Sequence, residues 1–230
     1  AIMTKPFAFE GDRRRKIAEA ALEELKDKVD TLIVIPNDRI LQIIDRKTSL
    51  LDAFGAVDNI LRQGVQGIAD IIMVTGLVNV DFADVRTVMK ETGDAIMGVG
   101  IGVGENRAIE ATQMAINSPL LEESGIEGAK AVLLNIVGGS DMSLHEVNEI
   151  TEIINKQVDP DANIIFGATI DPALDDKIRV TVIATGFDRK INMLNRPNEL
   201  DRATGTPLTV IEGKNHKERI EKKVPAQMKS

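Results

Sequence analysis

The stretch "LLDAFGAVDNILRQGVQGIADIIM", residues 50–73, decides how the rest of the chain is organised. Its apolar residues recur with the 3.6-residue period of an α-helix, at Leu50, Phe54, Val57, Leu61, Val65, Ile68 and Ile72. Such a helix is about 36 Å long at about 1.5 Å per residue. Gly55, Gly64 and Gly67 each cost it about 1 kcal/mol, so we expect a buried helix against which something packs closely. The pattern predicts a long central helix, residues 50–73, between two domains.

The segment before this helix, residues 1–49, has the pattern of the end of a doubly wound α/β sheet. Residues 1–5 read as a strand, residues 13–29 have helical spacing, and "TLIVI" (31–35) is a continuous apolar run. A short apolar run of this kind is typical of a parallel strand that is buried on both faces. Because the first strand begins at the first residue, we expect further chain upstream of it.

The segment after the helix predicts a second domain. A loop and a short helix (74–93) precede strands at 95–102, 129–138, 163–170 and 177–187 and helices at 105–117 and 143–157. This order, βαβαββ over residues 94–188, predicts one sheet with two helices on one face. The turn "DPALDD" leads us to expect the last two strands to pair as an antiparallel hairpin. Residues 189–230 are polar and aperiodic, which predicts a flexible tail.

Composition excludes several classes of function. The chain has 230 residues, no cysteine, two histidines and a formal net charge of −8. These values argue against a thiolate or histidine-rich metal site and against non-specific nucleic-acid binding. No apolar run approaches the roughly 20 residues needed to span a bilayer. We therefore expect no metal site, no nucleic-acid partner and no membrane insertion.

Glycine alternates with other residues in "GVGIGVGEN", at positions 98, 100, 102 and 104. The spacing does not fit the dinucleotide-binding pattern GxGxxG. A period of two residues instead predicts a strand with small residues on one face.

Two groups of polar residues are candidates for nucleotide contacts. Glu10 and Arg14 lie four residues apart at a helix start, where they form either an exposed salt bridge or contacts to ribose and phosphate oxygens. Asn37 follows a predicted parallel strand, at the edge where α/β sheets bind ligands, although Pro-Asn-Asp is also a turn sequence. Asp58 has apolar neighbours and lies one turn from Phe54; its carboxylate could accept two guanine N–H groups while the Phe54 ring lies on the purine.

A third group follows the central helix in "GLVNVDFADVRTVM", residues 76–89. Asn79 or Asp81 could cap the next helix, with Asp84 in its first turn. The other interpretation is that these residues form half of a catalytic site.

Several strings together resemble the FtsZ family, the bacterial tubulin-like cell-division GTPases. They are "TKPFAFEG", "DTLIVIPNDRIL", "NILRQGVQGIAD", "GLVNVDFADVRTVM", "GENRA" and "VIATGF", and the resemblance runs from residue 1 to about 188. It implies the end of a Rossmann-like GTPase domain (1–49), a central helix (50–73), a synergy loop with a short helix (74–93) and a C-terminal domain (94–188).

The resemblance also implies roles for the candidate residues. Glu10 and Arg14 match ribose- and phosphate-side positions, Asn37 and Asp58 match guanine-base positions, and Phe54 matches the aromatic residue beside the purine. The implied ligands are GTP or GDP with Mg²⁺.

Asn79, Asp81 and Asp84 match the synergy loop. In the family this loop enters the nucleotide pocket of the next subunit in a head-to-tail filament and completes GTP hydrolysis there. The implied setting is the cytoplasm, at the division ring at mid-cell.

The sequence departs from the family pattern in two places. The glycine-rich phosphate loop G-G-G-T-G-T-G does not occur in it, so we expect the isolated chain to be inactive and to need an N-terminal half of the same protein as a partner. An alternative is a non-enzymatic module that caps or joins filaments. The tail segment "VPAQMKS" only partly matches the family peptide that docks onto membrane-anchor division proteins.

Overall fold

The computed structural model describes residues 1–74, 76–121 and 125–187. The chain divides into two units, Ala1–Arg189 and Lys190–Ser230, and every described residue belongs to the first. The predicted flexible tail and its "VPAQMKS" segment lie outside the described residues.

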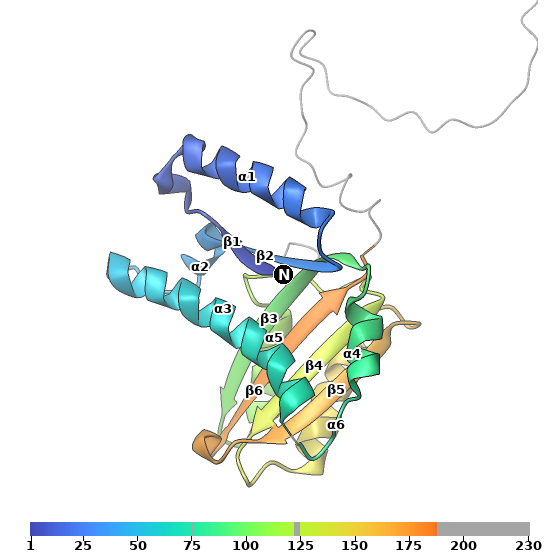
Figure 1. Cartoon of the computed structure of the whole chain (residues 1–230). Coiled ribbons are helices and arrows are strands. Elements are labelled where there is room, and N and C mark those ends of the chain that lie inside the picture. Colours follow the sequence, from blue (N-terminus) through green and yellow to red (C-terminus); the bar gives the residue numbers. More distant parts are fainter. Residues whose placement is uncertain (75, 122–124, 188–230) are drawn as a thin grey trace, which may run out of the picture. The chain divides into compact units, whose positions relative to one another are not determined.

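The first unit is a mixed α/β structure built on six strands (Figure 1). In chain order the elements are β1 (Ile2–Lys5), η1 (Ala8–Glu10), α1 (Asp12–Lys26), β2 (Thr31–Pro36), α2 (Asn37–Ile40), α3 (Leu50–Met73), α4 (Phe82–Met89), β3 (Gly93–Val103), α5 (Arg107–Ile116), β4 (Ala131–Gly138), α6 (Leu144–Asn155), β5 (Asn163–Ile170), η2 (Pro172–Leu174) and β6 (Lys177–Thr185).

The strands lie in the order β1-β2-β3-β6-β4-β5. β1, β2 and β3 are parallel to one another, β4 is parallel to β5, and β6 runs antiparallel to both of its neighbours. Gly93–Ala95 at the start of β3 pair with Thr31–Ile33 of β2. The strands on the two sides of α3 therefore belong to one sheet.

The expected hairpin between the last two strands is wrong. β6 lies between β3 and β4, and β5 pairs only with β4 among the strands. The reason is that β6 is buried on both faces along most of its length, from Ile178 to Thr185. A strand that is apolar on both faces is most stable inside a sheet, with a neighbour on each side.

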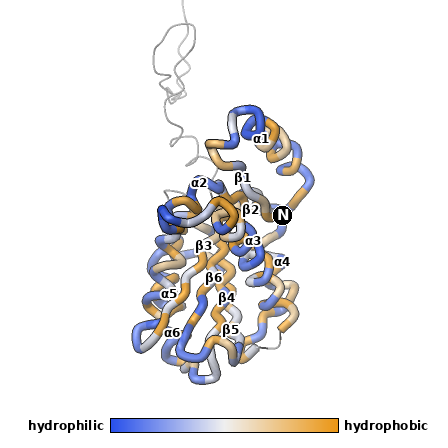
Figure 2. Tube along the Cα trace, turned by 90° about the vertical axis from the view of Figure 1, so that its left-hand side faces the viewer, coloured by the Kyte–Doolittle hydropathy of each residue, from blue (hydrophilic) through white to orange (hydrophobic). Residues whose placement is uncertain are grey.

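Helices cover both faces of the sheet. α5 and α6 cover one face, as the sequence predicted, and α3 and α4 lie on the other (Figure 1). Alternate residues of β4 divide accordingly: Val132, Leu134 and Ile136 join the core under α5 and α6, and Leu133 joins the core under α3 and α4. Figure 2 shows the apolar residues concentrated along β3, β4 and β6.

The glycine alternation in β3 allows α5 to lie directly on the sheet. A Cβ added at Gly98, Gly100 or Gly102 would lie 2.0 Å from a backbone carbonyl oxygen of α5, that of Ala115, Ala111 or Arg107 respectively. No side chain fits in this space, so the three glycines are required by the close approach of the helix. The prediction of a strand with small residues on one face is confirmed.

The glycines of α3 differ from one another. A Cβ at Gly64 would lie 2.6 Å from the Sδ of Met97, and one at Gly67 would lie 3.2 Å from the Cγ2 of Thr181. These two glycines are buried where α3 crosses the sheet, as expected. A Cβ at Gly55 would meet nothing within 4 Å, so close packing does not explain this third glycine.

Candidate functional site

The candidate nucleotide-side residues gather where β1 and β2 end and α3 begins. The carboxyl ends of these strands are neighbours, because Lys5 pairs with Pro36. The Oδ1 of Asp38 in α2 accepts a hydrogen bond of 2.9 Å from the backbone N–H of Ala8 in η1. Phe7 then contacts Phe54 of α3 edge to face, with ring centroids 5.4 Å apart.

Glu10 forms the predicted pair with Arg14. The Nη1 of Arg14 lies 2.5 Å from one carboxylate oxygen, and the backbone N–H of Phe7 donates to the other at 2.9 Å. The hydrogen bond from Arg14, followed by that from Phe7, lowers the pKa of Glu10. The Glu10 side chain is 12% exposed and the Arg14 side chain 70%, so the arginine keeps donors that face solvent.

Asn37 is the buried polar residue of this group. It begins α2 directly after β2, is 5% exposed, and its Oδ1 accepts no hydrogen bond from any described residue. A buried acceptor without a donor costs about 1–3 kcal/mol. Its neighbour in the turn, Asp38, is exposed and satisfied, so turn chemistry alone does not account for Asn37.

Phe54 and Asp58 lie one helical turn apart at the start of α3. Phe54 packs its edge against Phe7 and remains 39% exposed. Asp58 is exposed although its sequence neighbours are apolar, so its carboxylate is accessible. The adjacent residue Val57 takes the buried position, because neighbours in a helix point about 100° apart.

The acidic loop lies at the other end of α3. The side chain of Asp81 caps α4 by accepting a hydrogen bond of 3.1 Å from the backbone N–H of Ala83, and Asp84 lies in the first turn of that helix. The Oδ1 of Asn79 accepts a hydrogen bond of 2.8 Å from the N–H of Gly76. All three predicted side chains are exposed.

The loop itself is fixed against the sheet. The backbone N–H groups of Leu77 and Val78 donate to the carbonyl oxygen of Ala168 in β5 at 2.8 and 3.3 Å, and the N–H of Ala168 donates back to Val78 at 3.3 Å. The acidic side chains therefore project from a backbone that is held in place.

Exposed apolar side chains lie close to the acids along the chain. Met73 is 81% exposed, Leu77 68% and Phe82 59%. Large apolar residues gathered on an exposed surface are typical of an interaction surface. The sequence contains these residues, but periodicity alone did not identify them as exposed.

A further cluster of charged side chains joins the starts of α5 and α6, and local sequence patterns give no sign of it. The Nε of Arg107 lies 2.6 Å from Oε1 of Glu146, and its Nη1 lies 2.5 Å from Oδ2 of Asp141. The arginine side chain is 6% exposed, and its hydrogen bond is the main cause that lowers the pKa of Glu146. The backbone and hydroxyl groups of Ser143 also donate to Glu146, so this network stabilises the start of α6.

In the described ranges, no three His, Cys, Asp or Glu side chains gather in a way that could hold a metal ion. None of the helices in those ranges is both long enough and apolar enough to cross a membrane.

The six-stranded sheet with helices on both faces, and the long α3 between two groups of polar residues, define a mixed α/β protein with a candidate site at each end of its central helix. The family model described as "FtsZ family, C-terminal domain" matches residues 93–188 of this chain. The chain also matches the FtsZ dimer from M. jannaschii, with 43% sequence identity, a TM-score of 0.77 and coverage of 81% of this chain and 54% of that one. The chain is FtsZ-like, and residues 93–188 carry the C-terminal domain of that family.

More distant solved structures share the fold. The GDP-bound monomer of CetZ1 from Haloferax volcanii is 19% identical, with a TM-score of 0.63 and coverage of 84% of this chain and 57% of that one. The GTPγS-bound protofilament of CetZ2 from the same organism is 18% identical, with a TM-score of 0.61 and coverage of 82% and 55%. The chain thus spans about half the length of the solved relatives that it matches.

Proposed function

We propose that the chain is part of a filament-forming cell-division GTPase. In this proposal it supplies guanine-contacting residues to its own nucleotide site and acidic residues to the site of the next subunit. The main support is the separation of the two groups: Phe54 lies near the start of α3, Asp81 follows its end, and the helix is 24 residues long. From Phe54 to Met73 at the end of α3, 73 − 54 = 19 residues at about 1.5 Å each span about 29 Å, too far for both groups to contact one nucleotide.

The nucleotide side suits a purine with adjacent N–H donors. The buried Oδ1 of Asn37 is available to a donor from a ligand. The exposed carboxylate of Asp58 can accept from the N1–H and N2–H groups of guanine, and the exposed part of the Phe54 ring can lie against the base. Glu10 and Arg14 are assigned to ribose and phosphate oxygens.

GTP or GDP with Mg²⁺ is the proposed ligand of the complete protein. The described residues include no cluster that could hold a metal ion by themselves. Because the chain spans about half the length of its relatives, phosphate and Mg²⁺ contacts are assigned to an N-terminal half of the same protein. The isolated chain is then inactive, and the proposed setting of the complete protein is the division ring in the cytoplasm.

The loop side suits catalysis in a neighbour. Phosphoryl transfer depends mainly on positioning and electrostatics, which exposed carboxylates on a fixed backbone can supply to an attacking water and to nearby cations. Asp81, Asp84 and Asn79 are the proposed groups, and the exposed Leu77 and Phe82 supply apolar contact area around them. A head-to-tail contact of this kind does not close on itself and therefore produces a filament.

The test is reconstitution with an N-terminal half taken from the FtsZ of M. jannaschii, measuring GTP binding and GTP turnover separately. Asp84→Ala is expected to abolish turnover and leave binding intact. Asp81→Ala is expected to do the same and also to remove the cap of α4, which costs about 1 kcal/mol of stability. Glu19→Ala, which removes an exposed acid from α1, is the control and should change neither quantity. Loss of binding together with turnover in Asp84→Ala would contradict the proposed role.

A second candidate function is a non-enzymatic module that caps or joins filaments. In this proposal, membrane-anchor division proteins bind the tail of the complete protein. The lack of the glycine-rich string G-G-G-T-G-T-G in the given sequence favours it. It predicts that the chain shortens or bundles filaments of a full-length relative in sedimentation assays while turnover stays absent even when an N-terminal half is supplied.

A further inference from the structure

The outer edge of β5 is open along most of its length. β5 is the last strand of the sheet, and an isolated bridge between Ala168 and Val78 is the pairing found on its outer side within the described residues. Alternate residues of a strand point their backbone groups to the same side. The N–H and C=O groups of Ile164 and Phe166 therefore point outward as those of Ala168 do, and no described residue pairs with them.

The bridge shows that this edge accepts an antiparallel partner. Val78 both donates to and accepts from Ala168, at 3.3 Å in each direction. The outward N–H and C=O groups of Ile164 and Phe166 lie along the same edge as those of Ala168. An extended peptide placed there would add a strand to the sheet, which is one of the common modes of peptide recognition.

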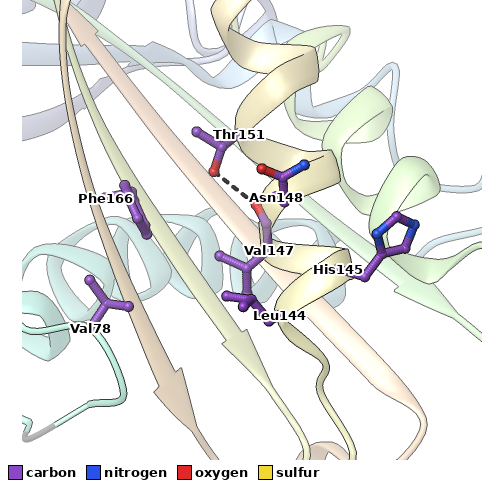
Figure 3. Close-up of a pocket in the computed structure, with 7 residues that line it drawn as sticks. All are labelled: Val78, Leu144, His145, Val147, Asn148, Thr151 and Phe166. Atoms are coloured by element: carbon purple, nitrogen blue, oxygen red, sulfur yellow. Dashed lines mark hydrogen bonds between the residues drawn. The ribbon is translucent and has the colours of Figure 1, made fainter.

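An apolar pocket of about 570 Å³ lies beside these open backbone groups. Leu144, Val147, Asn148 and Thr151 of α6 line one side, and Phe166 and Val78 line the other. Figure 3 shows Leu144 and Val147 pointing from the helix toward Phe166 and Val78. Since side chains of a strand alternate between the two faces of its sheet, every second side chain of an added strand would point into this pocket.

The charge around the edge indicates the chemistry of the partner. Asp159 and Asp161 precede β5, and Asp81 and Asp84 lie at the start of α4, which contacts β5. These four carboxylates are exposed and form no ion pair with the described residues. The pocket lining contains no lysine or arginine. Arg86 of α4 and His145 of the pocket lining are exposed as well, but the four aspartates outnumber them. A basic partner is therefore complementary to this edge, and an acidic one is not.

We propose that the open edge of β5 is a strand-addition site for an extended segment of another protein in which apolar residues alternate with lysine or arginine. The main chain of the segment pairs with Ile164 and Phe166, its apolar side chains fill the pocket under α6, and its cations lie among the four aspartates. Because loop residues 76–81 contact the same strand, an occupied edge would also compete with the neighbouring subunit. That competition rests on the proposed function, whereas binding of the segment to the isolated chain does not.

The test uses the whole chain and a fluorescein-labelled peptide of about eight residues that alternates valine with lysine, followed by fluorescence anisotropy. Saturable binding is expected, and a peptide with glutamate in place of lysine should bind at least about tenfold more weakly. Two further peptides carry N-methyl groups on alternate amides, one on the odd set and one on the even set. One set faces the strand and the other faces solvent, so only one of these peptides should lose binding. Equal binding of both, or of the lysine and glutamate peptides, would overturn the proposal.

Variants at Ile164 of β5 test the same hydrogen bonds by changing the protein instead of the peptide. Ile164→Pro removes an N–H group that points outward from the sheet. The hydrogen bonds to β4 should remain, because they are made by the alternate residues: the N–H groups of Asn163 and Asp171, for example, donate toward β4 at 2.9 Å. The variant loses the hydrogen bond that the N–H of residue 164 would donate to the peptide, and the adjacent hydrogen bonds become less well aligned. We expect the peptide to bind about tenfold more weakly. Ile164→Val keeps the N–H and is the matched control, expected to bind as the unchanged chain does. Equal binding by the two folded variants would overturn the proposal, and if Ile164→Pro does not fold, the pair of N-methylated peptides decides.

Discussion

Replacing Gly100 by alanine should separate α5 from the sheet and destabilise the fold. The new Cβ would lie 2.0 Å from the carbonyl oxygen of Ala111 and 2.7 Å from the backbone nitrogen of Ala115. An ordinary contact needs about 3.4 Å or more, so α5 must move outward by about 1.4 Å. Backbone atoms cannot rotate away as a side chain can, and the matching contacts at Gly98 and Gly102 resist the movement.

We expect a cost near the top of the overpacking range, about 3 kcal/mol, reduced by about 0.5–1 kcal/mol because alanine is better than glycine in a strand. The net loss of about 2–2.5 kcal/mol should lower the melting temperature by about 4–10 °C in a chain of this size. Circular dichroism melts and urea titrations of the full chain measure it.

Gly55→Ala is the matched control, because a Cβ there meets nothing within 4 Å and the residue lies inside α3. It should stabilise the fold by about 0.5–1 kcal/mol. A melting temperature for Gly100→Ala equal to that of the unchanged chain would refute the close-approach reasoning.

Four other outcomes are expected. The pKa of Glu146 is lowered in the fold by its hydrogen bond from Arg107, so its contribution to stability is present above the unfolded value of about 4.3 and is lost as pH falls through the lower folded value. Glu146→Gln should destabilise the chain at pH 7 by about 1.5–3 kcal/mol, and its stability in urea titrations should decline less with acid than that of the unchanged chain. The isolated chain should show no measurable heat of GTP binding by calorimetry, and a low-micromolar dissociation constant would contradict this. After reconstitution, Asp58→Ala should weaken the preference for GTP over ITP and ATP about ten- to a hundredfold, and an unchanged preference would remove Asp58 from the base site. Fragment 94–188 should melt cooperatively but below fragment 50–188 in circular dichroism, because it lacks α3; a missing transition would show that α3 belongs to its core.

Periodic features of the fold could be predicted closely from the sequence. The central helix was expected at 50–73 and spans Leu50–Met73, and the helices expected at 105–117 and 143–157 are Arg107–Ile116 and Leu144–Asn155. The alternating glycines also predicted their strand. Each of these follows from local spacing, which the sequence displays directly.

Features that depend on distant partners could not be predicted. The strand at 177–187 was expected, but its pattern does not say which neighbours it joins, and the turn before it favoured the wrong one. The exposure of Asp58 could not be foreseen, because apolar sequence neighbours do not fix the direction of a side chain. Arg107 and Glu146 are 39 residues apart, and no local pattern connects them.

In the candidate site, too, local sequence features could be predicted and features that depend on tertiary packing could not. The sequence identified the polar residues, and the resemblance assigned roles to them, which stay proposals. That Asn37 is buried with a free acceptor, whereas Asn79 is exposed and satisfied within its loop, depends on tertiary packing and became visible only in three dimensions.

The contact between α5 and β3 sets a limit on its own length. Two residues of a strand advance about 6.6 Å and four residues of a helix about 6.0 Å, so one glycine meets one turn of α5 at Gly98, Gly100 and Gly102 in succession. Each step adds a mismatch of about 0.6 Å, and a few further steps would bring side chains rather than carbonyl groups over the glycines. An insertion between Gly98 and Gly102, or between Arg107 and Ala115, should therefore break this match. An insertion in the turn between Val103 and Arg107 should be tolerated, because the two spacings no longer need to agree there.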